Sequence, residues 1–424
     1  MMKTTAVRMY GAMDLRLETF ELPPLGEDEI LMRVVSDSLC TSTYKAVLQG
    51  SAHKRVPSDI GKNPVIIGHE MCGEIAAVGK NIGSRWQVGQ RAVIQPALKL
   101  ENGHDVGYSF QYIGGSATYV VVPAVVLERG CLLPFEGDAF FQGSLVEAFG
   151  CILRGYKGFY HTDYENYKRT DGAKSGGRLA ILGGTGPMGL GAVEMAVGSV
   201  GVRQIVVTDL NPERLTWAAR QCSAEYAREK GVSLQYLNTG VLEDPVQTLI
   251  AASEGGFDDV FVMAPVPELF SMAEQICRVD GCINFFAGPA QHELPGSLNL
   301  YRVHYDGIHV VGTAGSIPQD TEETIALIEQ KRIRPEVLVS HICGLSAVPE
   351  AIFSMKTPAG AKKVCYPELD LPMIALDELP QRGKTDPLCR ELAKILEQNG
   401  GLWCAQAERY LLAHAPRMRE DTGR

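Results

Sequence analysis

The sequence predicts an α/β protein with a β-rich N-terminal domain followed by a parallel-sheet domain. Residues 1 to about 150 contain short β-branched or alternating runs, separated by Gly, Pro and acidic turns. From about residue 178, apolar runs alternate with helical segments, which indicates βαβ units and a parallel sheet. A glycine-rich turn, "GGTGPMG", directly follows the first of these later runs.

The composition excludes several classes of protein. The chain of 424 residues is 45% hydrophobic and 21% charged, as soluble domains are, and it has room for two or three domains. A formal net charge of −10 gives nucleic-acid binding little electrostatic support. No apolar run approaches the roughly 18 residues of a membrane helix. Without a signal-peptide core or a CxxC pair among its eleven cysteines, the chain is expected to be cytoplasmic, with reduced thiols and no membrane partner.

The N-terminal region is expected to form a compact barrel or sandwich. Its runs have the β-branched or alternating composition of strands. The expected strands are "TTAVRMYG", "LRLETFEL", "EILMRVVSDSLC", "GEIAAVG" and "GQRAVIQP", and "YVVVPAVVL" (119–127) also predicts a strand.

The later region alternates between strands and helices. Buried strands are expected at 178–184, 204–209, 258–264 and 281–288, and helices at 187–201, 212–231 and 267–279. Between the two regions, the polar residues 162–177 predict an exposed loop.

The tail from Tyr366 predicts two helices. Asp386-Pro387 is a plausible helix start, and Asn399-Gly400-Gly401 ends that helix. A short amphipathic helix is marginal alone, so we expect the tail to pack on the catalytic domain or on a partner subunit. The alternative is a flexible tail, because "DELPQRGKTDP" resembles a linker. The apolar stripes are Leu388, Leu392, Ile395 and Leu396 in the first helix, and Trp403, Tyr410 and Leu411 in the second.

A dinucleotide site is predicted at the glycine-rich turn. Gly184, Gly186 and Gly189 form G-x-G-x-x-G between a strand and a helix, the context that makes this motif meaningful. We expect the first glycine to permit the turn, the second to let the backbone approach a pyrophosphate, and the third to let helix and strand pack closely. Pro187 and Met188 open the helix, whose N-terminus faces the phosphates.

The acidic end of the next strand favours NAD(H). Asp209 stands where a carboxylate binds the ribose hydroxyls, and it would repel a 2′-phosphate. Arg214 could soften this preference, so NADP(H) stays possible. A glycine-rich turn with a purely structural role is the alternative to this site.

A metal site is predicted around the "GHE" letters. His69 and Glu70 lie in a run of small and apolar residues, where unpaired charge is expensive. Alone, they could be a core histidine and a glutamate on a solvated face. Cys40 ends an expected strand, and Glu147 lies just before the nucleotide-binding half. Cysteine, histidine and carboxylate are the ligand types of an open catalytic zinc site.

At this point the sequence resembles the zinc-containing alcohol dehydrogenases of the medium-chain dehydrogenase/reductase superfamily. "GHEMCGEIAAVGKNI" fits their pattern, and Cys40, Glu147 and "GGTGPMG" follow in matching order. The resemblance covers residues 1 to about 365. It implies a GroES-like catalytic domain (1–155), a doubly wound Rossmann domain (156–312) and a return to the catalytic domain (313–365). The helical C-terminal extension (366–424) is expected from the pattern of the tail itself.

The resemblance implies roles for the residues of the site. Cys40 and His69 are carried over as zinc ligands, and Glu70 and Glu147 share the remaining carboxylate role, directly or through water. Ser42 matches the hydroxyl that passes the proton to or from the substrate oxygen, with Thr43 as the fallback. A strand-end hydroxyl bonded to the backbone is the alternative for Ser42. The implied reaction interconverts an alcohol and its ketone with NAD(H).

The chain departs from the family in three places. Residues 97–119 contain no cysteine, so the four-cysteine lobe is missing and we expect one catalytic zinc and no structural zinc. Lys45 stands where many members have the histidine of the outer proton relay. The tail beyond Tyr366 has no counterpart in ordinary members.

The substrate is expected to be a small sugar or sugar phosphate. Lys45, His53, Lys54 and Arg55 form a local basic cluster in an acidic chain, and such a cluster could bind a phosphate. A solvated loop is the alternative. An unphosphorylated polyol or secondary alcohol is the competing substrate, and a non-catalytic nucleotide-binding protein is the competing class. We expect a homo-oligomer, either a dimer or a tetramer.

Overall fold

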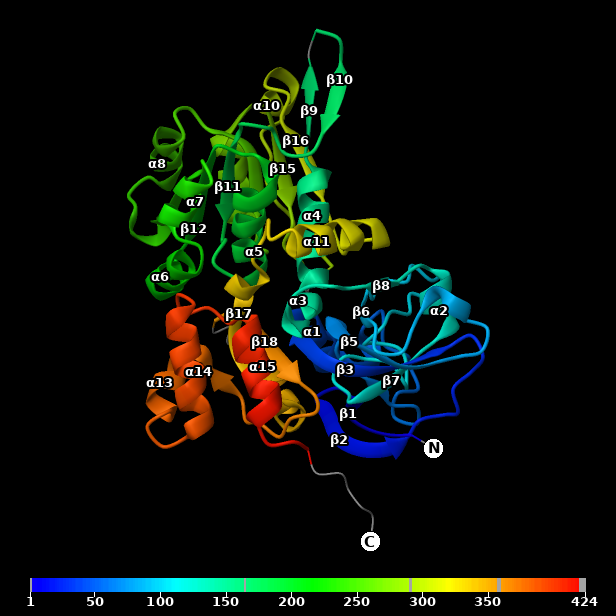
Figure 1. The fold of residues 1–424 in the computed structure, drawn as a ribbon. Helices are drawn as coiled ribbons and strands as arrows, with labels where there is room; N and C mark the ends of the chain where they lie inside the picture. The colour runs from blue at the N-terminus through cyan, green and yellow to red at the C-terminus, as the bar shows by residue number, and fades with distance from the viewer. Residues whose placement is uncertain (1, 164, 290–291, 357–359, 419–424) are drawn as a thin grey trace. The chain divides into compact units, whose positions relative to one another are not determined.

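The computed structural model describes residues 2–163, 165–289, 292–356 and 360–418. The chain forms two compact units (Figure 1). The first comprises Met1–Glu147, Ile317–Glu329 and Val339–Arg424, and the second comprises Ala148–Ser316 and Gln330–Leu338.

The first unit is built on antiparallel β-structure. Its strands are β1 (Lys3–Gly11), β2 (Asp14–Glu21), β3 (Ile30–Leu39), β4 (Val65–Ile66), β5 (Met71–Val78), β6 (Arg91–Ile94), β7 (Tyr119–Val122), β8 (Leu132–Pro134), β17 (Val339–Gly344), β18 (Lys362–Tyr366) and β19 (Ile374–Ala375). An eight-stranded sheet has the order β19-β17-β18-β3-β5-β6-β8, with β7 also paired to β3. A three-stranded sheet has the order β2-β1-β4. The β-rich N-terminal region is therefore confirmed.

Helices connect and cover these strands. They are α1 (Thr41–Gln49), α2 (Ala124–Glu128), α3 (Phe140–Ser144), α11 (Pro318–Glu329), α12 (Val348–Phe353), α13 (Leu379–Arg382), α14 (Pro387–Gln398) and α15 (Ala405–His414). The strand expected at 119–127 is wrong beyond Val122, because Pro123 ends the strand and stands at the N-cap of α2. Proline has no N–H for a β-ladder and suits a helix start.

The two tail helices are confirmed within the first unit. The Asp386 side chain accepts hydrogen bonds from two backbone N–H groups at the start of α14, as a helix cap does. Of the predicted stripes, Leu392, Ile395, Leu396, Trp403 and Leu411 are buried, and Leu388 and Tyr410 are partly buried. The last residues of the predicted extension, 419–424, lie outside the described residues.

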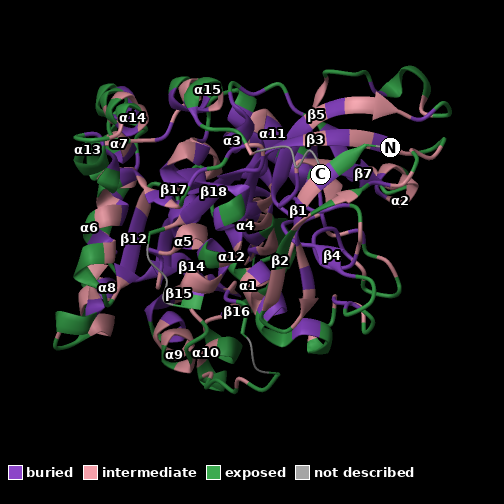
Figure 2. Ribbon diagram, turned by 90° about the horizontal axis from the view of Figure 1, so that it is seen from below, coloured by how far each residue is buried: buried purple, intermediate pink, exposed green. Residues whose placement is uncertain are grey.

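The second unit is a doubly wound parallel sheet. Its strands are β9 (Tyr160–Asp163), β10 (Lys168–Asp171), β11 (Arg178–Leu182), β12 (Gln204–Asp209), β13 (Ser233–Asn238), β14 (Phe257–Val262), β15 (Cys277–Phe285) and β16 (His309–Gly312). Six of them form a parallel sheet of order β13-β12-β11-β14-β15-β16, the strand order of dinucleotide-binding folds. Strands β11 and β14 are buried throughout, and Figure 2 shows buried strands beneath helices with exposed outer faces.

The helices of this unit follow the predicted alternation, with two corrections. They are α4 (Val146–Gly158), α5 (Pro187–Met195), α6 (Pro212–Gln221), α7 (Ala224–Glu229), α8 (Pro245–Ala252), α9 (Pro267–Ile276) and α10 (Leu300–Tyr305). The single helix expected at 212–231 is wrong, because the Ser223 side chain caps a second helix, α7. The loop expected at 162–177 includes the end of β9 and all of β10, which pair as an antiparallel hairpin, and of the two strands only β10 is exposed throughout.

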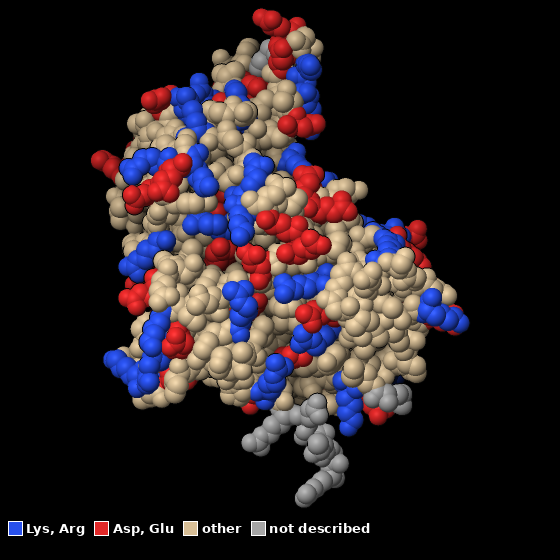
Figure 3. Space-filling model, in the orientation of Figure 1, with Lys and Arg blue, Asp and Glu red and all other residues tan. Residues whose placement is uncertain are grey.

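The surface carries charges of both signs. Figure 3 shows Lys and Arg side chains interspersed with Asp and Glu on the face in view. Among the residues that the structure describes, every helix is too short or too polar to cross a membrane.

Candidate active site

Three neighbouring strands of the first unit bring the candidate metal ligands to one edge of the sheet. Strand β3 runs between β5 and β18 and is antiparallel to both, with Asp37 opposite Met71 and Leu39 opposite Lys363. The end of β3 therefore lies beside the starts of β5 and β18. Cys40 directly follows β3, the His69-Glu70 pair directly precedes β5, and Lys362 opens β18.

Cys40, His69 and Glu70 form a group of potential metal ligands. One ligand atom from each, a sulfur, a ring nitrogen and a carboxylate oxygen, all lie within 4.8 Å of one another. Both His69 and Glu70 are buried, and Nε2 of His69 is 3.9 Å from Oε1 of Glu70. Sulfur, imidazole and carboxylate are the donor types of a catalytic zinc site, so the residues present fit this metal.

Glu147, the other predicted carboxylate ligand, lies outside this group of three. It stands in the first turn of α4. Burial is the main cause of the raised pKa of Cys40, and the charges of Glu70 and Glu147 add to it. The carboxylate of Glu147 is therefore close enough to act electrostatically on the Cys40 thiol.

Burial sets the protonation of the ligand group. Burial lowers the pKa of His69 to about 4, so the imidazole is neutral at pH 7 and can offer a lone pair. Burial raises the pKa of Cys40 to about 11, so the thiol carries a proton at pH 7 when no metal is bound to it. A metal bound here would have to displace that proton, because the thiolate is the ligand form.

Lys362 is a member of the site that sequence reasoning missed. Its ammonium donates hydrogen bonds to both Glu70 oxygens, at 2.6 Å for Oε2, across 292 residues of sequence. Burial alone would lower the pKa of Lys362, but Cys40, whose thiol ionises before Lys362 loses its proton, and the Glu70 carboxylate outweigh burial and raise that pKa. In turn, burial would raise the pKa of the Glu70 carboxyl, but the charge of Lys362 outweighs burial and lowers that pKa. No motif around Lys362 marks it in the sequence.

The two predicted hydroxyl residues lie on different sides of the imidazole. The Ser42 Oγ atom is 3.1 Å from the Cys40 sulfur and 3.3 Å from Nε2 of His69. The Thr43 Oγ1 atom is instead 3.2 Å from Nδ1, the other ring nitrogen. Thr43 thus fixes the ring orientation, and Ser42 is the hydroxyl on the ligand side.

Tyr108 is a second residue that sequence reasoning missed. Its hydroxyl donates a 2.9 Å hydrogen bond to Ser42 Oγ, and its ring packs 5.0 Å from the His69 ring. Gly107 has a φ of +77°, and a Cβ there would lie 2.1 Å from the Gly68 carbonyl oxygen, so only glycine permits this approach. Tyr108 belongs to the cysteine-free segment 97–119, which gave no signal beyond the missing lobe.

Two residues of the predicted basic cluster lie against Tyr108. The His53 ring stacks 5.8 Å from the Tyr108 ring, and the Arg55 guanidinium lies 5.1 Å from it. Asp105 holds Arg55 through a 2.9 Å ion pair. Lys54 is exposed, and Lys45 is partly buried on α1, the helix that carries Ser42. The structure thus connects His53 and Arg55 to the metal-ligand group through Tyr108.

The glycine-rich turn connects β11 to α5. Gly186 is the N-cap of α5, Pro187 and Met188 open its first turn, and a Cβ on Gly189 would lie 2.4 Å from the Gly184 carbonyl oxygen. The third glycine therefore permits close packing, as expected. Gly183, directly before the motif, also contributes to the turn, with a positive φ of +67°. Gly184 is required for space, since a Cβ there would lie 2.7 Å from the Ile181 side chain.

Asp209 and Arg214 lie at this turn. Asp209 ends β12, and it accepts a hydrogen bond from the Thr185 hydroxyl within the glycine-rich turn. Its other oxygen accepts the Leu210 N–H at 2.8 Å. The guanidinium of Arg214 would be 3.3 Å from a Cβ placed on Gly186. The acidic and the basic residue predicted to select the coenzyme thus both face the turn.

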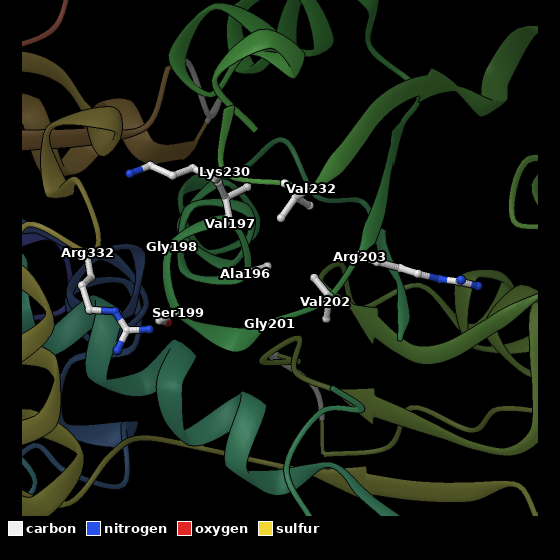
Figure 4. Close-up of a pocket in the computed structure, with 11 residues that line it drawn as sticks. Ala196, Val197, Gly198, Ser199, Gly201, Val202, Arg203, Lys230, Val232 and Arg332 are labelled. Atoms are coloured by element: carbon white, nitrogen blue, oxygen red, sulfur yellow. The ribbon is translucent and has the colours of Figure 1, made fainter. Parts of the chain in front are cut away.

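A separate pocket of about 350 Å³ lies at the other end of this sheet, before β12 and β13 (Figure 4). Its basic side chains do not converge, because Arg203 and Lys230 extend in opposite directions in Figure 4. We therefore assign no ligand to it. Its lining residues are Ala196, Val197, Gly198, Ser199, Gly201, Val202, Arg203, Lys230, Gly231, Val232 and Arg332.

The chain matches two family models. Residues 26–129 match the alcohol dehydrogenase GroES-like domain, and residues 187–330 match the zinc-binding dehydrogenase family. L-sorbose 1-phosphate reductase of Klebsiella pneumoniae is 44% identical over 99% of this chain and 100% of its own length. Mannitol-1-phosphate 5-dehydrogenase of Aliivibrio fischeri is 41% identical over 97% and 98%. The solved structure of Bacillus subtilis 2R,3R-butanediol dehydrogenase has the same fold, with a TM-score of 0.70 and 22% identity over 86% of this chain and 99% of that one.

Proposed function

The chain belongs to the zinc-binding alcohol dehydrogenase family, and from this premise we propose that it reduces a ketose phosphate to a polyol phosphate. It is an oxidoreductase, as its relatives are. The substrate that we propose is L-sorbose 1-phosphate, reduced at its C2 ketone to D-glucitol 6-phosphate. Two full-length relatives above 40% identity carry the name of a phosphorylated sugar or polyol, which supports a phosphorylated substrate.

The observation that carries the proposal is the group of Cys40, His69 and Glu70 beside the Ser42 hydroxyl. We propose that these three residues, with Glu147 nearby, hold one zinc ion. Zinc, when bound, supplies a Lewis acid that polarises a carbonyl and lowers the pKa of an alcohol. Cys40 and His69 would hold the zinc ion in place. Glu70 would supply a negative charge, part of which Lys362 neutralises through its hydrogen bonds.

We propose that the Ser42 hydroxyl passes the proton of the reaction to or from the substrate oxygen. During reduction the substrate oxygen gains a proton, and the Ser42 hydroxyl stands next to two of the proposed ligands. The Tyr108 hydroxyl donates to Ser42 Oγ, so Tyr108 does not use the Ser42 hydrogen. That hydrogen is donated to the Cys40 sulfur, next to which a substrate oxygen could take its place as the acceptor. Burial raises the pKa of Tyr108, so its hydroxyl remains a donor at neutral pH. In this proposal Tyr108 takes the outer position of the proton relay.

The substrate phosphate is proposed to bind Arg55 and His53. Both contact Tyr108, which is hydrogen-bonded to Ser42, so a phosphate there would be a few bonds from the reacting carbon. Asp105 fixes the Arg55 guanidinium, which reduces the entropy lost on binding. Arginine recognises phosphate through paired, charge-assisted hydrogen bonds.

The coenzyme is proposed to be NAD(H), bound at the glycine-rich turn. Its nicotinamide supplies the hydride chemistry when bound. Asp209 favours a ribose with free hydroxyls, whereas Arg214 at the same turn leaves NADP(H) possible.

An unphosphorylated polyol is the competing substrate. A kinetic comparison separates the phosphorylated from the unphosphorylated substrate. It measures the oxidation of D-glucitol 6-phosphate and of free D-glucitol by NAD, in wild type and in Arg55→Gln. We expect the wild type to prefer the phosphate ester, and the variant to lose roughly 10- to 100-fold in kcat/KM for that ester only, because a charge-assisted hydrogen bond contributes roughly 1.5–3 kcal/mol. Lys54→Gln, which removes an exposed charge of the same cluster, is the control. Equal turnover of both polyols would favour the competing substrate.

A homo-oligomer is also proposed. Strand β16 is at the edge of its sheet, and an unpaired edge is a template for a second chain. Next to it, α10 exposes Leu300, Tyr301 and Tyr305 by 72%, 66% and 64%. Such an exposed apolar group beside an open edge is typical of an interface. Sedimentation of wild type and Tyr305→Glu tests this, and a wild-type monomer at micromolar concentration would contradict it.

A further inference from the structure

The tail places a carboxylate in the interior of the first unit. Glu408 on α15 is only 2% exposed. Its Oε2 accepts the Phe140 N–H at 2.7 Å, and its Oε1 accepts the Phe141 N–H at 2.8 Å. Tyr366 on β18, the strand beside α15 in Figure 1, donates to the same Oε1 at 3.1 Å. Trp403 Nε1 donates in turn to the Tyr366 hydroxyl at 2.9 Å, so the carboxylate is held from both sides.

Glu408 acts as the cap of α3 from a distant part of the chain. Phe140 and Phe141 open α3, and the first N–H groups of a helix have no partner inside it. The N-cap residue of α3 is Ala139, which has no side-chain oxygen. Glu408 supplies that oxygen across 268 residues of sequence.

Helix α3 leads directly to a proposed metal ligand. It ends at Ser144, and Glu147 stands in the first turn of the next helix, α4. Helix α3 is also tightly packed, because a Cβ on Gly143 would lie 2.4 Å from the sulfur of Cys72 on β5. With one end fixed by Glu408 and its side fixed by β5, α3 has little freedom to shift. The orientation of α3 therefore determines where Glu147 lies in the first turn of α4.

We propose that Glu408 is a positioning residue, through which the C-terminal tail holds α3 and thereby keeps the Glu147 carboxylate at the metal site. The inference rests on the proposed function, since it takes Glu147 to be part of a zinc site. It gives the tail a role in metal retention, beyond packing on the first unit. A merely structural Glu408 would change the stability of the fold and leave the metal site alone.

A double-mutant cycle tests this role with zinc retention as the readout. The rate of zinc release to a chromogenic chelator is measured for wild type, Glu408→Gln, Glu147→Gln and the double variant. We expect Glu408→Gln to release zinc about tenfold faster, because residues that orient metal ligands typically change metal affinity 10- to 100-fold. In the Glu147→Gln background the same change should have no further effect, since the group it positions is gone.

Two further variants keep the test decisive. Tyr366→Phe removes one hydrogen-bond donor to Glu408 and should also speed zinc release, but by less than Glu408→Gln does. This variant keeps the test possible if Glu408→Gln does not fold. Glu397→Gln changes an exposed carboxylate of the same tail and should release zinc at the wild-type rate. Unchanged release in both Glu408→Gln and Tyr366→Phe would overturn the proposal. So would an equal effect of Glu408→Gln in both backgrounds, or a Glu147→Gln variant that retains zinc normally. A wild type that binds no zinc would instead refute the proposed function.

Discussion

The ammonium of Lys362 donates hydrogen bonds to both carboxylate oxygens of Glu70, next to the buried imidazole of His69. This pair connects the start of β18 to the "GHE" segment before β5, across 292 residues of sequence. Both side chains are almost completely buried, at 3% and 1% exposure. Each member therefore depends on the other, because an isolated charge at this depth is strongly unfavourable.

Replacing Lys362 should destabilise the metal-free protein strongly. Lys362→Met leaves the Glu70 carboxylate buried without its partner, a change that typically costs roughly 3–5 kcal/mol. The thermal midpoint of the metal-free protein should fall, and added zinc should restore part of the loss because a cation again faces Glu70. Lys394→Met is the matched control, since Lys394 pairs with Glu391 on the surface, where such pairs contribute roughly 1 kcal/mol or less. Equal thermal midpoints for Lys362→Met and Lys394→Met would show that the buried Lys362–Glu70 pair does not stabilise the fold more than a surface pair does.

Metal content should be close to one zinc per chain. Residues 97–119 contain no cysteine for a second site, and the described ligand group contains Cys40, His69 and Glu70. Cys40→Ala or His69→Ala should remove the zinc and the turnover while NADH binding persists, because the glycine-rich turn lies in the other unit. Cys151→Ala, at a partly buried cysteine of the second unit, should keep its zinc. Elemental analysis that finds two zinc ions per wild-type chain would refute this prediction.

Coenzyme choice should depend on Asp209. Asp209→Ser removes the carboxylate that repels a 2′-phosphate, while the Arg214 guanidinium stays at the turn. The ratio of kcat/KM for NADPH to that for NADH should therefore rise by at least tenfold, and adding Arg214→Gln to this variant should reverse part of the gain. If the wild type already prefers NADPH, our interpretation of Asp209 is wrong.

The sequence was most informative where ligands and glycines fall in a fixed local pattern. "GHE", Cys40 and the glycine-rich turn predicted the ligand group and the start of α5, because strand ends and the turn are set by nearby residues. Local pattern also predicted the strand alternation of the second unit. It failed at Ser223, where a cap divides one expected helix into two.

What the sequence could not predict came from residues far apart along the chain. Lys362, Tyr108 and Glu408 carry no motif, and each acts on a partner at least 66 residues away. Their roles follow from strand pairing and from tail docking, which no local window contains. The burial of Glu408 had a faint signal at most, since it shares α15 with the predicted stripe residues Tyr410 and Leu411.

Stability should depend on pH through Glu408. Burial raises the pKa of its carboxyl from an ordinary 4.5 to about 7. Arg91 on β6 acts to lower that pKa, Tyr366 donates to the carboxylate, and the Cys72 thiol on β5 is the other titratable group near it. Between pH 4.5 and 7 the folded state therefore binds more protons than the unfolded state, so this contribution to stability falls as the pH rises through that window.

The comparison of wild type with Glu408→Gln isolates this effect. The stability of the wild type relative to the variant should be greatest near pH 5 and should decrease toward pH 8, by roughly 3 kcal/mol in total because one pKa unit corresponds to about 1.4 kcal/mol. Thermal midpoints of both proteins across pH 5–8 measure it. A difference that stays constant, or that grows with pH, would contradict the raised pKa.

The central claim is that the group of Cys40, His69 and Glu70 serves the reduction of a ketose phosphate. The most direct measurement is NADH consumption by the zinc-loaded enzyme with L-sorbose 1-phosphate, D-fructose 6-phosphate and the two free ketoses. We predict turnover of L-sorbose 1-phosphate with the highest kcat/KM of the four, at least tenfold above free L-sorbose, and none with Cys40→Ala. Faster reduction of the free ketoses, or NADH consumption that survives Cys40→Ala, would contradict the account.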